Sequence, residues 1–405
     1  MLTLNQKILN SPLAEKTYVV GGAIRDLNLK QPVNDIDYVV TVSQEEFLQH
    51  FPNVEMVGQD FPVFLIDGDE VALSRTERST GSGYGTFELT GVGVSIEEDL
   101  SRRDFTINAV AMNVVTKEIV DPFNGLADLS KGRITVTHSE SFKDDPVRIL
   151  RAFRFASRFG FRIEDDTLTQ AMKFGEELKF VTKERIVLEL EKVWKQSEKP
   201  SSFFRAASKT GLLDELIPNF GKMEAVPAGP VEFHGKNTAF DHTMETIDRA
   251  KAAGAPFHVF VAMIFHDFGK AFTDPEILPK HFGHEDRSAE LAEEFLFKHR
   301  FSKRVKEFVP KAAKLHMKAH RVTEMSARKL AKFAIAIGRR DFEDFIIVAE
   351  ADHPFSEKER KVVDIMREIV FNTDMSEVAT VPPNQRAQKA HQLRVSRIKH
   401  LLRSI

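Results

Sequence analysis

The sequence contains no cysteine, so disulfide bonds and thiolate chemistry are excluded. It also has no run of about 18 apolar residues, the length that a membrane-spanning helix needs. The first residues, MLTLNQKILNSPLAEK, do not have the pattern of a secretory signal. These absences together favour a cytoplasmic protein that does not enter a membrane.

A surplus of basic charge is missing as well, because the formal net charge is -3 at pH 7. A chain of this charge binds nucleic acid only through a local basic patch. Its 405 residues are enough for two or three domains, each with a core of its own. Hydrophobic residues make up 42% and charged residues 29%, a composition typical of a soluble globular protein.

The stretch of residues 18–40, YVVGGAIRDLNLKQPVNDIDYVV, predicts a strand, a Gly-Gly turn, a short helix with Arg25, and a second strand. Adjacent glycines after a strand let the backbone approach a ligand and leave amide groups free, a common way to seat a phosphate. Asp35 and Asp37 are two residues apart on the second strand, so their carboxylates leave the same face. A plain turn and a solvated strand edge explain each element alone, but together the elements favour a Mg-nucleotide site.

Residues 55–74 alternate in short apolar runs and predict two paired strands that extend the same sheet. Residues 75–91, RTERSTGSGYGTFELTG, predict a mobile functional loop, with a plain hairpin connection as the alternative. Arg102, Arg103 and Asp104 then precede an apolar run that we expect to be helical, with Asp104 at its start. Two arginines at a helix start can hold a triphosphate, although such a pair is also common on a solvated surface.

Within residues 141–163, SFKDDPVRILRAFRFASRFGFRI, we predict a strong helix with Asp144 or Asp145 as its cap, Pro146 in its first turn and Gly160 near its end. Three arginines recur every three residues and so share one gradually rotating face: Arg148, Arg151 and Arg154. One interpretation is a solvated basic stripe. The other is that Asp145 and Arg148 offer acceptors and donors to a base edge while the remaining arginines hold phosphates. Residues 183–195 predict a packing helix with internal ion pairs.

Five motifs occur in order between residues 17 and 216: GGAIRD, DID, RRDFTINA, DDPVRILRAFRF and ERIVLELEKVW. With these five motifs the chain resembles the class II tRNA nucleotidyltransferases, which comprise the CCA-adding enzymes and the bacterial poly(A) polymerases. The segments MVGQDFPVFLI and RTERSTGSGYG, and the region after residue 230, are most similar to CCA-adding enzymes with an appended HD domain. Nothing resembles the extra basic C-terminal region of the poly(A) polymerases.

The resemblance implies that Asp35 and Asp37 bind two catalytic Mg2+ ions, which activate the tRNA 3′-hydroxyl for attack on the α-phosphate of CTP or ATP. Asp145 and Arg148 would read the base edges, so that the protein itself acts as the template. The resemblance further implies these nucleotide-binding residues: Gly22, Arg25, Arg103, Asp145, Arg148, Arg151 and Arg154. The loop of residues 75–91 matches the flexible loop that family members need for the switch from CTP to ATP.

Two positions depart from the family pattern. The base-reading motif usually begins with Glu, but here it begins with Asp144, which is one methylene shorter and predicts poorer discrimination between bases. Many relatives also carry a third carboxylate on the strand near Ala72, where this chain reads EVALS. Glu70 is close to that position, but its register is open from sequence, so the third ligand stays unassigned.

Ten of the 14 histidines lie between residues 234 and 353, which favours a metal site over even spacing. The segments FDHTMETID, VAMIFHDFGKA, HFGHEDRSAE and EADHP resemble the HD superfamily of metal-dependent phosphohydrolases. The resemblance implies four metal ligands: His242, His266, Asp267 and Asp352. His284 is a further candidate for metal or phosphate, and the alternative is that each histidine is an ordinary core or surface residue.

Histidine and carboxylate ligands suit Ni2+, Mn2+ or Co2+ better than Mg2+ alone. The apolar run HVFVAMIFHDFGK predicts a buried helix that ends at the histidine–aspartate pair. The implied activity is a phosphodiesterase or phosphatase acting on 2′,3′-cyclic or terminal phosphates.

The last residues, 378–405, contain no acidic residue and predict an amphipathic basic helix. Its basic residues are Arg386, Lys389, Arg394, Arg397, Lys399 and Arg403. This segment is either a contact for the tRNA backbone or a packing helix with a solvated basic face.

We therefore expect an α+β protein, with a small mixed-sheet nucleotidyltransferase head followed by an all-helical neck and body that contain an HD domain. The expected domains are a head (1–140), a neck with base recognition (141–225), an HD domain (226–360) and a basic helical tail (361–405). The expected function is template-independent addition of CCA to tRNA by a monomer or homodimer, with a second, HD-type activity. A poly(A) polymerase and a non-catalytic RNA- or nucleotide-binding protein are the alternatives.

Overall fold

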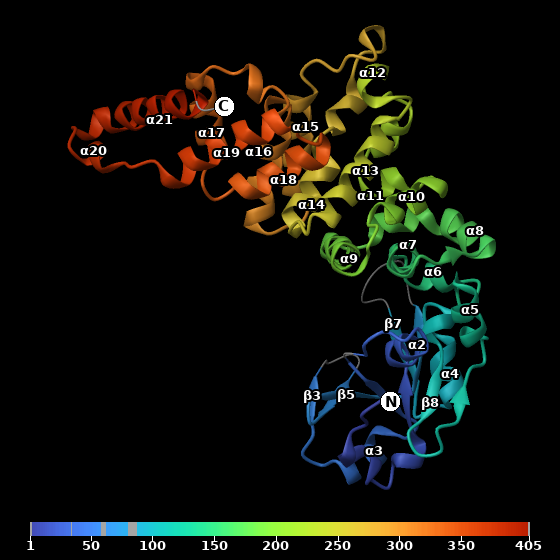
Figure 1. The fold of residues 1–405 in the computed structure, drawn as a ribbon. Coiled ribbons are helices and arrows are strands. Elements are labelled where there is room, and N and C mark those ends of the chain that lie inside the picture. Colours follow the sequence, from blue (N-terminus) through green and yellow to red (C-terminus); the bar gives the residue numbers. More distant parts are fainter. Residues whose placement is uncertain (1, 34, 58–61, 80–86, 404–405) are drawn as a thin grey trace. The chain divides into compact units, whose positions relative to one another are not determined.

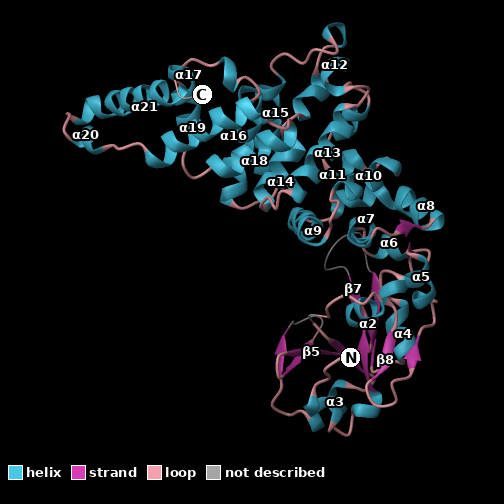
Figure 2. Ribbon diagram, in the orientation of Figure 1, coloured by secondary structure: helices cyan, strands magenta, loops and turns pink. Residues whose placement is uncertain are grey.

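The computed structural model describes residues 2–33, 35–57, 62–79 and 87–403, and the chain divides into two compact units (Figure 1). The first unit comprises Met1–Glu189 and Arg205–Leu216, and the second comprises Leu190–Phe204 and Ile217–Ile405. All strands among the described residues belong to the first unit, whereas the second unit is helical over its described part (Figure 2). The expected α+β fold is confirmed.

The first unit is built on a seven-stranded sheet with the order β3-β4-β5-β2-β1-β8-β9. Its strands are β1 (Thr17–Val20), β2 (Asp37–Val40), β3 (Glu55–Val57), β4 (Val63–Ile66), β5 (Asp69–Leu73), β8 (Ala111–Asn113) and β9 (Ile119–Val120). Neighbouring strands are antiparallel except for β2 and β5, which run parallel. The two paired strands predicted within residues 55–74 are β4 and β5, and β3 continues the sheet beyond them.

The register of β2 and β5 places two acidic residues side by side. Val39 pairs with Ala72, so Asp37 and Glu70, each two positions earlier, are also neighbours. Because side chains alternate along a strand, both acids project from the face that carries Val39 and Ala72. That face packs against α4 (Ile96–Ser101) in the smaller of two core clusters of the sheet. The register of Glu70, which the sequence left open, therefore places it beside Asp37.

The helices of the first unit are α1 (Gln6–Leu9), α2 (Gly22–Asn28), α3 (Gln44–His50), α4, α5 (Gly125–Lys131), α6 (Ser141–Asp144), α7 (Val147–Phe159), α8 (Asp165–Phe174) and α11 (Leu213–Leu216). Helices α9 (Lys183–Gln196) and α10 (Ser201–Lys209) have residues in both units. Shorter 3-10 turns are η1 (Ala14–Lys16), η2 (Thr106–Asn108) and η3 (Gly175–Phe180), and β10 (Arg133–Ile134) pairs with β11 (Arg162–Ile163).

The helix predicted within residues 141–163 is α7, with Pro146 at its start and Gly160 as its C-cap, but a separate short helix, α6, precedes it. Helix α6 ends at Asp144, Asp145 adopts an extended conformation with φ -143 and ψ 101, and α7 begins after Pro146. The proline explains the break, because its ring disfavours the helical conformation of the residue before it. As a result, Asp145 lies at the bend between α6 and α7, directly before the helix that carries the arginines.

The apolar run after Asp104 is not a helix either. It forms η2 and strand β8, in which Ala111 pairs with Val20 of β1. Val110 packs in the larger core cluster of the sheet, whereas Ala109 and Ala111 pack in the smaller one. Only an extended chain presents alternate residues to two faces, so pairing with β1 outweighs the helical tendency of the run.

The predicted loop of residues 75–91 has strands at both ends. β6 (Arg75–Ser79) and β7 (Phe87–Val92) form a two-stranded antiparallel ribbon with a register shift near Thr76. Residues 80–86, between these strands, lie outside the described residues. A role for this loop in the switch from CTP to ATP stays a prediction.

The second unit is an assembly of helices: α12 (Val231–His234), α13 (Ala239–Ala252), α14 (Phe257–Phe265), α15 (His284–Lys298), α16 (Lys303–Ala319), α17 (Ala327–Ile337), α18 (Phe342–Asp352), α19 (Glu357–Asn372), α20 (Ser376–Ala379) and α21 (Arg386–Leu402). Its 3-10 turns are η4 (Phe220–Glu224), η5 (Phe268–Phe272), η6 (Pro275–Ile277), η7 (Val322–Glu324) and η8 (Pro383–Gln385). Helix α14 is apolar around its circumference and packs against α13, α16 and α18. The predicted buried helix is confirmed, and His266 and Asp267 directly follow it.

The basic C-terminal helix α21 packs against α17 and α19 (Figure 1). Ile398 is buried, while Lys389 and Arg397 pair with Glu377 and Glu368. The helix therefore contributes to packing, and a contact with tRNA stays a prediction. Across the described residues, no helix combines the length and the apolar character needed to cross a lipid bilayer.

Candidate functional site

A cavity of about 440 Å³ in the first unit brings together most of the predicted nucleotide site. Its lining is Gly21, Gly22, Arg25, Asp37, Arg102, Arg103, Asp104, Asn108, Asp145, Arg148, Arg151, Phe155 and Arg185. Six of these residues are arginines, which are fully charged at neutral pH and donate in a fork that matches phosphate oxygens. The cavity is therefore suited to a polyanion.

The backbone at Gly21 shows why a glycine is needed there. Its φ of 63 lies in the left-handed region, and a Cβ atom added to it would lie 3.0 Å from Nη1 of Arg103. A larger residue would therefore be strained in its backbone and would also displace this guanidinium. The Gly-Gly turn thus allows Arg103 to approach the start of α2.

A chain of hydrogen bonds connects three sequence motifs along the wall of this cavity. Arg25 is buried and donates to Asn108 Oδ1 at 2.6 Å, and Asn108 Nδ2 donates to Asp104 Oδ1 at 2.9 Å. Arg151 closes the chain by donating through Nε to Asp104 Oδ2 at 2.7 Å. The aromatic ring of Phe155 lies under Arg25 and Arg151, at 5.3 and 5.5 Å from their guanidinium carbons. These contacts hold both arginines in fixed positions at the cavity wall.

Asp104 is the buried acid of this network. Burial alone would raise its pKa, but Arg151 and the hydrogen bond from Asn108 lower the pKa to about 2. The carboxylate is therefore charged at all physiological pH values, and it neutralises part of the arginine charge. The sequence predicted that Asp104 begins a helix, but in the structure it positions Arg151 directly and Arg25 through Asn108.

Of the two predicted magnesium ligands, Asp37 is the first residue of β2, whereas Asp35 precedes the strand, so the prediction that both lie on it is wrong. Both residues retain some exposed surface, and Asp37 lines the cavity, where neighbouring groups displace part of its hydration. The pKa of Asp37 is raised, first by loss of hydration and next by the negative charge of Glu70, while Arg103 opposes the change. The carboxylates of Glu70 and Asp35 thus both repel that of Asp37 in the free protein. Oxygen donors of this kind fit Mg2+.

Asp145 and Arg148 both line the cavity, but each has a partner that the sequence did not predict. Arg185 on α9 donates to Asp145 through two parallel bonds of 2.9 and 2.7 Å. Arg148 donates to Ser141 Oγ at 2.9 Å and to the carbonyl oxygen of Arg102 at 2.8 Å. Arg185, expected to take part in ion pairs within its own helix, is therefore a cavity residue.

Arg154 does not line this cavity. Its side chain is buried and donates to Glu189 of α9 at 2.6 Å. This pair thus joins α9 to the helix that carries the arginine stripe. A direct contact between Arg154 and nucleotide stays a prediction. Asp144, the departure from the family motif, lies at the end of α6 with its carboxylate 3.4 Å from His138 Nε2.

The second unit brings the four predicted metal ligands together. They come from α13 (His242), the end of α14 (His266 and Asp267) and the end of α18 (Asp352), and all are buried. One ligand atom from each of the four lies within 4.8 Å of the others. The Nε2 atoms of His242 and His266 lie 3.6 and 3.5 Å from Asp267 Oδ2. Such a set of two histidines and two carboxylates fits a divalent transition metal.

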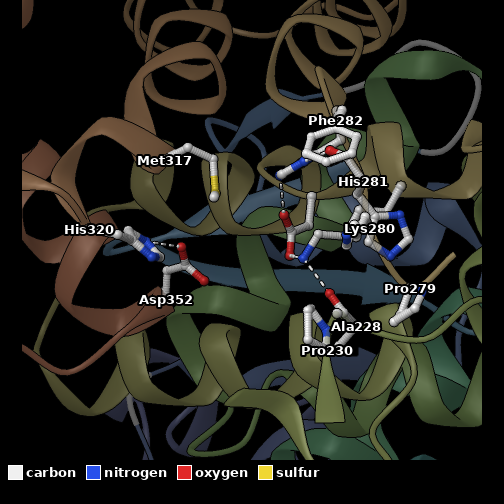
Figure 3. Close-up of a pocket in the computed structure, with 13 residues that line it drawn as sticks. Ala228, Pro230, Pro279, Lys280, His281, Phe282, Met317, His320 and Asp352 are labelled. Carbon is white, nitrogen blue, oxygen red and sulfur yellow. Dashed lines mark hydrogen bonds and ion pairs between the residues drawn. The ribbon is translucent and has the colours of Figure 1, made fainter. Parts of the chain in front are cut away.

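Two further side chains hold the carboxylates of this cluster. Lys270 Nζ donates to Asp267 Oδ2 at 2.6 Å and to the carbonyl oxygen of Ala228 at 2.7 Å. His320 Nε2 lies 2.7 Å from Asp352 Oδ2, and Figure 3 shows these two side chains next to each other. Although burial would raise the pKa of Asp267, the charge of Lys270 beside it keeps that pKa well below its usual range. Sequence reasoning did not select Lys270 or His320 as site residues.

A cavity of about 260 Å³ opens beside this cluster and reaches Asp267, Lys270 and Asp352. The segment just before α15 forms one side of it, and Figure 3 labels Lys280, His281 and Phe282 there. His284, the further candidate from sequence, also lines the cavity. The cluster is therefore buried in the protein but accessible to a small molecule from one side.

Two family models match segments between residues 17 and 223, and solved structures match nearly the whole chain. Residues 17–135 match the family described as the poly A polymerase head domain, and residues 160–223 match one described as a probable RNA and SrmB-binding site of polymerase A. Among solved structures, a Thermotoga maritima CCA-adding enzyme complexed with tRNA has a TM-score of 0.67 at 23% identity and covers 99% of this chain and 96% of that one. An apo form of a CCA-adding enzyme has a TM-score of 0.68 at 23% identity, with 99% and 97% covered. At these identities the similarity shows the fold.

Curated relatives are closer in sequence. A protein of Methylobacillus flagellatus named multifunctional CCA protein is 38% identical over 348 residues, which are 83% of this chain and 83% of the relative. A protein of the same name from Actinobacillus pleuropneumoniae serotype 5b is 37% identical over 352 residues, covering 83% and 84%. With more than a third of its residues identical over most of both lengths, the chain belongs to the family of multifunctional CCA proteins.

Proposed function

We propose that this protein adds C, C and A to the 3′ ends of tRNA, with CTP and ATP as substrates. The observation that carries this proposal is the cavity of the first unit, where six arginines face the carboxylate of Asp37. A nucleoside triphosphate needs cations around its phosphates, and the attack by a hydroxyl group needs carboxylates that hold divalent metal. The names of the curated relatives and of the solved CCA-adding enzymes support the same reaction.

Asp35, Asp37 and Glu70 are the residues that would hold Mg2+. Their carboxylate oxygens are the donors that Mg2+ prefers, and their mutual repulsion disappears when a divalent cation lies between them. Such ions supply a lowered pKa for the attacking 3′-hydroxyl and a counter-charge for the leaving pyrophosphate. Arg25, Arg103 and Arg151 would bind the triphosphate.

Asp145, Arg148 and Arg185 would select the base. A carboxylate accepts from the exocyclic amino group that cytosine and adenine share, and guanidinium groups donate to their ring nitrogens or to the cytosine oxygen. The bidentate bond from Arg185 fixes Asp145 at the bend before α7, so its remaining lone pairs have a defined direction. Arg185 thus joins the two residues expected from sequence.

The test uses tRNA that lacks its CCA end, incubated with Mg2+ and with CTP and ATP singly and together. Addition of two C residues and then one A supports the proposal, whereas long A tails support a poly(A) polymerase. Asp37→Asn should abolish incorporation, and Glu55→Gln, on the edge strand β3 of the same sheet, should leave it unchanged. Incorporation by the Asp37→Asn variant at the parental rate would contradict the assignment of the site.

We propose a second activity for the helical unit: metal-dependent hydrolysis of phosphate esters, including 2′,3′-cyclic phosphates. The buried cluster of His242, His266, Asp267 and Asp352 beside a cavity carries this proposal. These ligands fit Ni2+, Mn2+ or Co2+. Lys270, at the wall of the cavity, would bind the phosphate.

The experiment is release of phosphate from 2′,3′-cyclic nucleotides in the presence of each metal. Asp352→Asn should abolish release and leave CCA addition intact, because the two sites belong to different units. Glu350→Gln is the matched control, since Glu350 lies on the same helix but pairs with Arg360 at the surface. Equal phosphate release by the Asp352→Asn variant and the parent would show that the cluster is not the hydrolytic site.

A further inference from the structure

The histidine cluster of the second unit contains more ligand atoms than one metal ion uses. Among buried side-chain atoms that lack a hydrogen bond in the described residues, four belong to this cluster: Nε2 of His266, His284 and His316, and Oδ1 of Asp267. All four residues are more than nine-tenths buried. Buried polar atoms without partners are rare, and a group of four in contact indicates an absent ligand that they share.

The backbone sets the orientation of each of these three imidazole rings. Nδ1 of His266 lies 2.8 Å from the carbonyl oxygen of Met263, and Nδ1 of His284 and His316 each lies 2.6 Å from the carbonyl oxygen three residues earlier. A carbonyl oxygen only accepts, so each Nδ1 carries the proton and donates. In the neutral ring, Nε2 is then a bare lone pair that points into the cluster, which is the form that binds a metal.

The two oxygens of Asp267 face two different pairs of imidazole rings. Oδ2 lies 3.6 and 3.5 Å from Nε2 of His242 and His266. Oδ1 lies 3.1 and 3.5 Å from Nε2 of His284 and His316. On the Oδ1 side, acceptors face an acceptor at close range, an arrangement that is unfavourable unless a cation lies between them.

These separations match those of atoms that coordinate a common ion. Ligand atoms with bonds of about 2.1 Å to one ion lie about 3.0–3.4 Å apart in octahedral or tetrahedral geometry. We propose that the second unit binds a pair of divalent metal ions bridged by Asp267. One ion has the ligands His242, His266, Asp267 and Asp352, and the other has Asp267, His284 and His316. This deepens, and rests on, the hydrolytic function proposed above.

The two positions differ in charge and accessibility. The first has two carboxylates, whereas the second shares one carboxylate and otherwise has neutral imidazoles, so the second ion binds more weakly. His284 and Asp267 both line the cavity, so coordination places left open on the second ion face a substrate. An anionic phosphate that bridges both ions would tighten the second one. The substrate class is therefore a phosphate ester with two accessible oxygens on phosphorus.

The test counts metal ions in the full-length protein. To remove the contribution of the first unit, all samples carry Asp37→Asn; they are stripped with a chelator and dialysed to equilibrium against Mn2+. We expect two equivalents of Mn2+ in this parent, and one in the variants that add His284→Gln or His316→Gln. His400→Gln, an exposed histidine of α21, should retain two equivalents.

Electron paramagnetic resonance provides a second measurement that does not depend on a variant folding well. Two Mn2+ ions that share a carboxylate are magnetically coupled, so the hyperfine pattern of isolated Mn2+ should weaken as the second equivalent binds. A single equivalent in the parent, with both histidine variants unchanged, would overturn the proposal. Two coupled ions without phosphate release would preserve the metal pair and reject the hydrolase, while release with one ion would do the reverse.

Discussion

Replacement of Glu70 by glutamine should raise the stability of the metal-free protein. It should also lower the rate of nucleotide addition in the presence of Mg2+. Glu70 and Asp37 are neighbours on parallel strands, about 5 Å apart by the usual strand spacing. Two like charges at this distance in an aqueous surrounding repel by about 0.8 kcal/mol, and salt reduces this value. The variant should therefore gain up to about that much free energy of unfolding at neutral pH.

The sign of the pH dependence follows from Asp37. Its pKa in the folded protein is raised, so its ionisation reduces stability as the pH rises through that pKa. The gain from Glu70→Gln should therefore appear at neutral pH and vanish in acid, where both carboxyl groups are protonated. Urea unfolding in the presence of a chelator, at neutral and at acidic pH, measures this difference.

The same substitution should weaken Mg2+ binding by about 10- to 100-fold, as loss of a group at a metal site typically does. Calorimetric titration with Mg2+ and the rate of CMP incorporation into tRNA provide the measurements. Glu55→Gln on β3 serves as the control for removing a carboxylate from the sheet. If Glu70→Gln lowered stability in chelator, or incorporated CMP at the parental rate, Glu70 would not be part of the carboxylate cluster.

Three further predictions concern other parts of the chain. Because the pKa of Asp104 is lowered to about 2, its charge contributes stability that is lost as the pH falls from about 4 to 2. The Asp104→Asn variant has no carboxylate to protonate, so its free energy of unfolding should fall by about 2 kcal/mol less than that of the parent over this pH range. Acid unfolding measures this difference, and the same pH dependence in both proteins would contradict the pairing of Asp104 with Arg151. Arg185→Lys keeps the charge but not the two parallel bonds to Asp145, so the ratio of kcat/KM for CTP over UTP should fall about 10-fold, and an unchanged ratio would remove Arg185 from base selection. Phe260→Ala removes a buried ring that stacks on Trp194 at 4.7 Å and should cost about 3–5 kcal/mol in chemical unfolding, with a cost below 1 kcal/mol arguing against this packing.

Features that depend on local pattern could be predicted from the sequence. The strand that begins at Asp37, the glycine turn before Arg25 and the buried helix α14 all follow from residue spacing over short windows. Most of the residues that the motifs assign to a nucleotide site line the arginine-rich cavity, because in each motif several chemically demanding residues lie close together. The contacts that connect those motifs in space were harder to predict.

Features that depend on distant partners could not be predicted. The run after Asp104 has helical tendency, yet it becomes β8 because β1 offers it hydrogen bonds. Arg185 looked like a packing residue because its partner, Asp145, is 40 residues away. The metal role proposed for His316 likewise depends on its position opposite Asp267, which spacing within its own helix does not reveal.

The chain of hydrogen bonds from Arg25 through Asn108 and Asp104 to Arg151 has a consequence for how the protein tolerates change. Each residue of the chain holds the next in position, so replacing one changes the contribution that each of the others makes to stability. Effects of substitutions in this chain should therefore not add, and a double substitution should cost less than the sum of the single ones. Sequence drift at these positions is then constrained jointly: a second change becomes tolerable only after a first, and the order in which changes arise decides which remain accessible.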